Sequence, residues 1–93
     1  MRLTPTQIQH IKGAIAGFDD AAEIYLFGSR ANDAAKGGDI DLLIFSNRIG
    51  LQQKIELKLR LIDLLGAQKI DLVIARDEKQ PFVRLARSEG IQL

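Results

Sequence analysis

The sequence predicts a small α/β (α+β) protein in which helices pack on one mixed β-sheet, in the order α-β-β-α-β-α. Short segments with helical spacing of apolar residues alternate along the chain with short runs of β-branched and aromatic residues. The 93 residues suffice for one hydrophobic core, so we expect a single domain over residues 1–93. Hydrophobic residues make up 46% of the chain and charged residues 27%, which is typical of a globular protein.

The first half of the chain is expected to contain one helix and two strands. The helix begins after Thr4, because Pro5 stands at its first position and Gln7 can complete a capping box. Residues 23–27 and 39–45 are rich in Ile, Leu and aromatic residues and are bounded by Gly, Ser and Asn, so they are predicted strands. The apolar residues of the helix that share one face are Ile8, Ile11, Ile15 and Phe18.

The second half is expected to contain two helices and one strand. Residues 51–65 contain good helix formers and neither Gly nor Pro, and Gly66 is the expected C-terminal stop. Residues 69–75 form the predicted third strand. A short last helix is expected over residues 80–88, beginning near Pro81.

The helix over residues 51–65 carries two apolar rows when its residues are placed at about 100° each. One row should pack on the sheet, and the other should be partly exposed and dock a partner subunit or a second copy. Replacing Leu57 and Leu61 with Glu would distinguish a core row from an interface, and the alternative is that the first or last helix covers the row. The two rows are Leu51, Ile55, Leu59 and Ile62, and Leu57, Leu61 and Leu64.

Composition excludes several classes of function. The absence of cysteine excludes a disulfide framework, a thiolate zinc site and a cysteine nucleophile. The net charge of +1 lacks the basic surplus of proteins that coat nucleic acid, so no direct nucleic-acid binding is expected. No apolar run approaches the roughly 20 residues that span a membrane, and the N-terminus has no signal core, so a cytoplasmic location is expected.

Three aspartates interrupt otherwise apolar strands. Asp39 and Asp41 share one face of the strand 39–45, separated by roughly 6.6 Å, and two carboxylates that close repel unless a cation lies between them. Asp71 interrupts the next strand, where the alternative is a strand-end residue that caps a turn or pairs with Lys69. Oxygen ligands suit Mg²⁺ or Mn²⁺, and two such ions serve phosphoryl or nucleotidyl transfer.

A glycine-serine turn leaves the first strand. Gly28 lets the backbone approach a ligand closely, the hydroxyl of Ser29 and nearby helical N–H groups can hold phosphate oxygens, and Arg30 adds positive charge. Such turns are common, and taken alone this one is more often an ordinary turn. Its position shortly before the strand with Asp39 and Asp41 favours phosphate binding.

These segments together resemble the minimal nucleotidyltransferases of the DNA polymerase beta superfamily. The resemblance rests on LFGSRA at 26–31, GGDIDLLI at 37–44 and IDLV at 70–73, and it extends from the first helix to the last. It implies the nucleotidyltransferase palm, in which the Gly-Ser pair holds the triphosphate. Many relatives have a serine before the first aspartate, where this chain has a glycine. By this resemblance the nucleotide-binding residues are Gly28, Ser29, Arg30 and Gly38, and the catalytic and metal-binding residues are Asp39, Asp41 and Asp71, the last also helping to activate the acceptor hydroxyl.

The resemblance also implies a partner. Small stand-alone members of the family are typically encoded beside a HEPN-domain ribonuclease and act as its antitoxin, and some transfer AMP from ATP to a tyrosine of that toxin. We therefore expect Mg²⁺ or Mn²⁺ as cofactor, ATP as substrate, and a HEPN-domain partner in a hetero-oligomer, or a homodimer. The main alternative is a catalytically weak binding module that neutralises such a toxin by complex formation, and a further one is nucleotidyl transfer to a small molecule of the aminoglycoside type.

Overall fold

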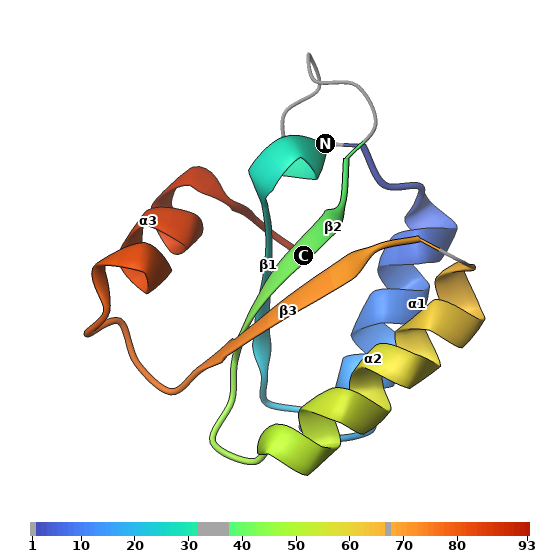
Figure 1. Ribbon diagram of the computed structural model, residues 1–93, viewed down its shortest axis with the longest axis horizontal. Helices are drawn as coiled ribbons and strands as arrows, with labels where there is room; N and C mark the ends of the chain where they lie inside the picture. Colours follow the sequence, from blue (N-terminus) through green and yellow to red (C-terminus); the bar gives the residue numbers. More distant parts are fainter. Residues whose placement is uncertain (1, 32–37, 67) are drawn as a thin grey trace.

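The computed structural model describes residues 2–31, 38–66 and 68–93. Within these residues the fold is mixed α+β, and the predicted order α-β-β-α-β-α is confirmed (Figure 1). Two short elements add to it: a 3₁₀ helix, η1, after the first strand, and a two-residue fourth strand. The elements are α1 (Pro5–Ala16), β1 (Glu23–Phe27), η1 (Gly28–Ala31), β2 (Ile40–Phe45), α2 (Leu51–Leu65), β3 (Ile70–Ala75), α3 (Pro81–Glu89) and β4 (Ile91–Gln92).

The predicted helix boundaries rest on identifiable caps. The hydroxyl of Thr4 accepts a hydrogen bond from the Gln7 N–H (3.1 Å), and the Gln7 side chain accepts one from the Thr4 N–H (2.9 Å), which completes the predicted capping box. α2 ends before Gly66, whose φ of +86° lies in the left-handed region that glycine tolerates. Neither these helices nor the third, within the described residues, has the length and apolar character needed to cross a membrane.

The sheet has the strand order β3-β2-β1-β4 and is mixed. β2 and β3 run parallel and are connected through α2, whereas β1 is antiparallel to both β2 and β4. The register pairs Asp41 with Asp71 on one side and with Phe27 on the other. Side chains of register partners lie on the same face of a sheet, so these three residues form one row across the strands.

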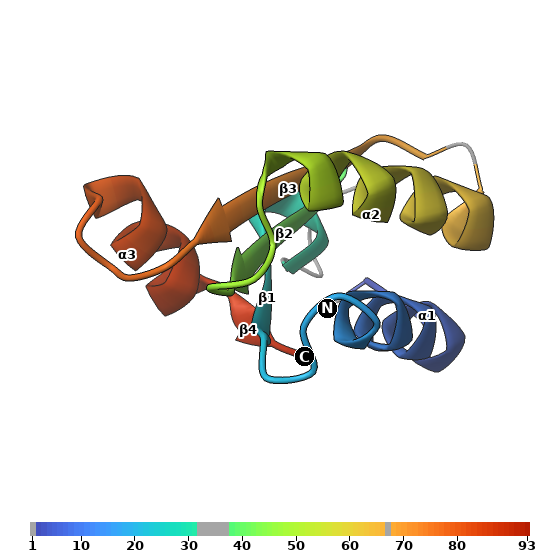
Figure 2. The ribbon, with the colours of Figure 1, turned by 90° about the horizontal axis from the view of Figure 1, so that it is seen from below.

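Helices cover the two faces of the sheet unequally, as Figure 2 shows. α1 and α2 cover one face, and the short α3 packs on the other. The first face meets the main hydrophobic core, and the second a smaller core of Tyr25 and Leu43 with Val83 and Ala86 of α3. Side chains alternate between the faces along β2: Ile40, Leu42 and Ile44 lie in the main core, and Leu43 and Phe45 lie on the other face.

The two apolar rows of α2 differ in their exposure to solvent. Leu57 and Leu61 are fully buried, so the idea that they form a docking surface is wrong. The row beginning at Leu51 is the exposed one, with exposed fractions of 75% at Leu51, 54% at Ile55 and 61% at Leu59. Both rows are similarly apolar. Which of them is buried depends on the side from which α1 and the sheet contact the helix.

Candidate active site

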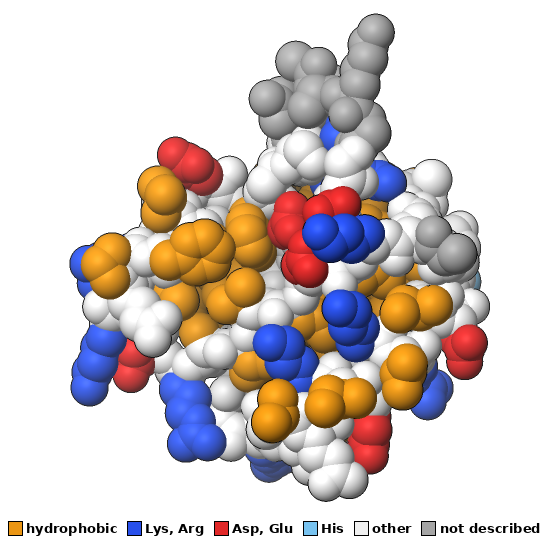
Figure 3. Space-filling view, viewed as in Figure 1, with side chains coloured by type: hydrophobic (Ala, Val, Ile, Leu, Met, Phe, Trp, Pro, Cys, Tyr) orange, Lys and Arg blue, Asp and Glu red, His pale blue; other side chains and the backbone are white. Residues whose placement is uncertain are grey.

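Three carboxylates meet at one end of the sheet. Asp39 directly precedes β2, Asp41 is its second residue, and Asp71 is the second residue of the neighbouring parallel strand β3. One carboxylate oxygen of each lies within 4.8 Å of the others, and all three residues are partly buried. Figure 3 shows acidic side chains gathered near the start of β2, with hydrophobic side chains on the side of α3. The structure thus brings together the three aspartates that the sequence singled out.

The electrostatics of this cluster favour a cation. Partial burial raises the pKa of Asp41 above its usual range, and the charges of Asp71 and Asp39 raise it further. Lys69 acts in the opposite direction: its Nζ lies 3.5 Å from Asp39 Oδ2, although its side chain is 70% exposed. This ion pair is with Asp39, whereas the sequence left open a pairing of Lys69 with Asp71. A set of oxygen donors in mutual repulsion fits a hard divalent ion.

Gly28 allows the turn after β1 to pass close to the carboxylates. Its φ is +73°, a conformation that L side chains rarely adopt. A Cβ atom at this position would collide with Oδ2 of Asp41. The turn therefore approaches the carboxylate cluster as closely as it does because residue 28 has no side chain.

Gly38 has an equivalent role on the opposite side of the turn. Its φ is +95°, and a Cβ atom there would collide with the hydroxyl of Ser29. The glycine therefore leaves room for Ser29 beside the segment that leads to Asp39, and a side chain at residue 38 would fill that space. Gly37, the other glycine of the sequence motif, lies outside the described residues.

Arg30 forms hydrogen bonds with three segments around the turn. Its Nε donates to the Gly38 carbonyl (3.3 Å), one terminal nitrogen donates to the Arg2 carbonyl (3.1 Å), and the other donates to Oε1 of Gln68 (2.9 Å). Arg2 in turn donates from its N–H to the Arg30 carbonyl (2.8 Å) and from its guanidinium to the Ser29 carbonyl (3.0 Å). Each guanidinium nitrogen of Arg30 thus has a protein acceptor, and its expected contact with nucleotide stays a prediction.

Arg2 and Gln68 were not singled out from the sequence. They reach the turn from positions 27 to 38 residues away along the chain, and no local pattern marks them. Gln68 also donates to the carbonyl of Leu65 at the end of α2 (2.8 Å), which connects the α2–β3 segment to the turn.

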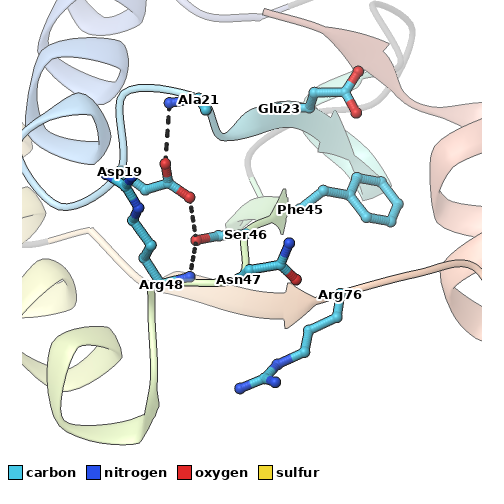
Figure 4. A pocket seen from close by; sticks show the side chains of 8 residues that line it. All are labelled: Asp19, Ala21, Glu23, Phe45, Ser46, Asn47, Arg48 and Arg76. Carbon is cyan, nitrogen blue, oxygen red and sulfur yellow. Dashed lines mark hydrogen bonds between the residues drawn. The ribbon is translucent and has the colours of Figure 1, made fainter.

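A cavity of about 300 Å³ lies at the opposite end of the sheet (Figure 4). Asp19 and Ser46, which are buried and polar, are among the residues that line it. The Ser46 hydroxyl donates a hydrogen bond to Asp19 Oδ2 (2.6 Å). The hydroxyl also accepts from the N–H groups of Arg48 and Ile49 (both 3.1 Å), so the pair joins the loop before β1 to the loop after β2. Its residues are Asp19, Ala21, Glu23, Phe45, Ser46, Asn47, Arg48 and Arg76.

This cavity is distinct from the carboxylate cluster in both place and chemistry. The cluster lies where β2 and β3 begin, and the cavity lies where they end. Hydrogen bonds already satisfy Asp19 and Ser46, which is the pattern of a structural link between loops. We therefore place the candidate chemistry at the carboxylates.

Comparison with known families identifies the family of the chain. A family model described as polymerase beta, nucleotidyltransferase, matches residues 9–93, which include all seven of the predicted site residues. The chain belongs to the polymerase beta nucleotidyltransferase family. A search of curated proteins found no match. Polymerase beta nucleotidyltransferases usually use a divalent metal and a nucleoside triphosphate, and the aspartate cluster of this member fits such a metal.

Proposed function

We propose that this chain transfers AMP from ATP to a hydroxyl of a partner protein in a reaction that depends on a divalent metal. The observation that carries the proposal is the convergence of Asp39, Asp41 and Asp71, with one oxygen of each within 4.8 Å, in a chain of the nucleotidyltransferase family. Carboxylates this close together can hold the two ions that nucleotidyl transfer uses.

The same three carboxylates would hold Mg²⁺ or Mn²⁺. All three donors are oxygen atoms, and burial together with the charges of Asp71 and Asp39 raises the pKa of Asp41, a penalty on its ionised form that a bound cation would offset. When bound, the metal neutralises charge on the transferring phosphate and favours the ionised form of the acceptor oxygen.

The residues of the chain itself have separate tasks in this reaction. The turn at Gly28 and Ser29 holds the β- and γ-phosphates, and Gly38 leaves the space that the Ser29 hydroxyl occupies. The acceptor oxygen attacks the α-phosphorus, the bond from that phosphorus to pyrophosphate breaks, and a carboxylate oxygen of Asp71 takes the acceptor proton. Arg30 and Arg2 keep the turn in position through their hydrogen bonds to its backbone and flanks.

A protein acceptor is supported by the surface of α2. Leu51, Ile55 and Leu59 expose an apolar row of the kind that marks protein interfaces. The resemblance to small antitoxin-type members suggests a HEPN-domain ribonuclease as the partner and one of its tyrosines as the acceptor, in a hetero-oligomer in the cytoplasm.

A second candidate is a binding module that neutralises such a toxin without efficient catalysis. Two contacts favour it: the guanidinium of Arg30 is used for protein hydrogen bonds, and Lys69 lies where it competes with a metal for Asp39. On this reading the fold is retained for its docking surface.

Labelled nucleotide separates the two candidates. The chain is incubated with its co-purified partner, Mg²⁺ and ATP labelled at either the α- or the γ-phosphate. Label on the partner from the α position only demonstrates nucleotidyl transfer, whereas a stable complex without label demonstrates the binding module. Asp41→Asn should abolish transfer, and Asp20→Asn, which changes an exposed aspartate between α1 and β1, should not.

A further inference from the structure

We propose that Phe27 and Phe82 form a seat for the base of the nucleotide, an inference that rests on the proposed function. Phe27 is the register partner of Asp41, so its side chain lies on the same face of the sheet as the carboxylates. The Phe82 ring lies edge-on to the Phe27 ring, with centroids 5.8 Å apart and an interplanar angle of 81°. Phe27 is thus the neighbour of Asp41 across the strands, and Phe82 extends the pair, here called the aromatic seat, toward α3.

The exposure of Phe82 is what makes the pair available to a ligand. Val83 and Ala86 of α3 are buried against the sheet, whereas Phe82 is 53% exposed beside the Phe27 ring. Exposed aromatic rings next to phosphate-handling groups provide stacking surfaces, because every nucleobase has a π-face. Leu85, also on α3, is equally exposed at 54% and serves as a natural control, since it lies outside the ring pair.

The geometry of the reaction assigns this seat to the base and not to the acceptor. In-line displacement places the attacking oxygen and the leaving pyrophosphate on opposite sides of the α-phosphorus. The pyrophosphate side is the turn at Gly28 and Ser29, directly after β1, so the acceptor enters from β3, the edge strand that carries Asp71. Figure 1 shows η1 and α3 on one side of the start of β2, and the start of β3 on the other. The rings lie on the β1 side, which the acceptor does not use.

The chemistry of the seat also sets its selectivity. Phenyl rings offer no hydrogen-bond donor or acceptor, so they recognise the area of a base and not its functional groups. The seat should hold purines more tightly than pyrimidines and should distinguish adenine from guanine poorly.

Binding of two ligands that differ only in the nucleoside tests the seat. The probes are ATP and inorganic tripolyphosphate, each with Mg²⁺, titrated calorimetrically into the parent chain, Phe82→Ala and Leu85→Ala. Loss of Phe82 should weaken ATP binding about tenfold and leave tripolyphosphate binding within about twofold, since stacking on one aromatic ring contributes to base binding alone. The Leu85 variant should bind both ligands as the parent does.

A fluorescent version gives a second readout. The chain contains no tryptophan, so Phe82→Trp introduces a single reporter at the seat. Its emission should change on addition of ATP with Mg²⁺ and should not change with tripolyphosphate.

The other outcomes overturn the seat in distinguishable ways. If Phe82→Ala weakens both ligands equally or neither, the ring has no role in holding the base, although the proposed function stands. If it leaves ATP affinity intact and raises the KM for the acceptor protein, the seat belongs to the acceptor. If the parent binds neither ligand, the proposed function fails and the base seat fails with it.

Discussion

Gly28 is the residue whose replacement should harm the candidate site most directly without removing a functional group. A side chain there would have to adopt φ near +73° and would collide with Asp41 Oδ2. We expect Gly28→Ala to lower the free energy of unfolding by about 1–2 kcal/mol from the backbone conformation alone and to displace the turn from the carboxylates. Thermal unfolding and ATP titration measure the two effects.

Gly13 provides the matched control for that substitution. It is an exposed glycine within α1, and a Cβ atom there meets nothing within 4 Å. Gly13→Ala should raise the free energy of unfolding by about 0.5–1 kcal/mol, because alanine favours the helix. Equal behaviour of the two variants would contradict the special role of Gly28.

Asp19 should make stability depend on pH at the opposite end of the sheet. The hydrogen bond from the Ser46 hydroxyl holds the pKa of Asp19 below its usual range, aided by the Ala21 N–H and the charge of Arg48 and opposed by burial. A lowered pKa stabilises the fold above the unfolded value, about pH 4, and this contribution is lost as the pH falls through the folded value.

The corresponding experiment compares Asp19→Asn with Asp20→Asn, which changes an exposed neighbour. In urea denaturation Asp19→Asn should be less stable than the parent at neutral pH, and the difference should shrink below about pH 4. Asp20→Asn should follow the parent throughout. A pH-independent deficit in Asp19→Asn would show that the charge of Asp19 contributes nothing.

The sequence predicted the residues that carry a local signature and missed those defined by long-range contacts. Asp39, Asp41 and Asp71 stand out because each is a polar residue within an apolar strand or directly before one. Asp19 and Ser46 sit 27 residues apart in loops of ordinary composition, so only the folded chain brings them together. Arg2, at the turn, is a similar case.

At the scale of elements, α2 offers the clearest test of what is core and what is surface. Leu57→Glu with Leu61→Glu should abolish folding, because two charges in a packed core cost more than about 5 kcal/mol, the stability of many small domains. Ile55→Glu with Leu59→Glu should leave the helical circular dichroism intact, since both residues are more than half exposed. An unfolded Ile55/Leu59 variant would show that this row is covered in the protein.

Elements were predictable where periodicity is sustained and caps are present. α1 has its capping box, and α2 has fifteen residues without a breaker. β4 has only two residues, Ile91 and Gln92, too few to show any alternation, and it forms because β1 offers an open edge. The orientation of α2 about its axis depends on α1, which periodicity within one helix does not encode.

At the scale of the whole molecule, binding of a metal at the aspartates would be coupled to folding. The carboxylate cluster exists only when β2, the α2 crossover and β3 are all in register, so an ion that binds it stabilises the entire fold. Mg²⁺ at ten times its dissociation constant should add about 1.4 kcal/mol to the parent, seen as a rise in Tm that EDTA reverses.

Asp41→Asn should be more stable than the parent without divalent ions and less stable than the parent with Mg²⁺. Without divalent ions the variant should melt above the parent, because the ionised form of Asp41 is disfavoured by burial and by its two neighbours. Addition of Mg²⁺ should leave the Tm of the variant nearly unchanged and carry the parent above it. A variant that responded to Mg²⁺ like the parent would place the ion elsewhere.

The carboxylate cluster has a consequence for the history of such proteins. Under the proposed function, a substitution of Asp41 or Asp71 that abolishes transfer also relieves repulsion in the cluster, so folding does not select against it. A gene copy released from catalysis could therefore lose these aspartates early while its product remains well folded. Inactive descendants of an enzyme built in this way should arise readily and persist as binding proteins.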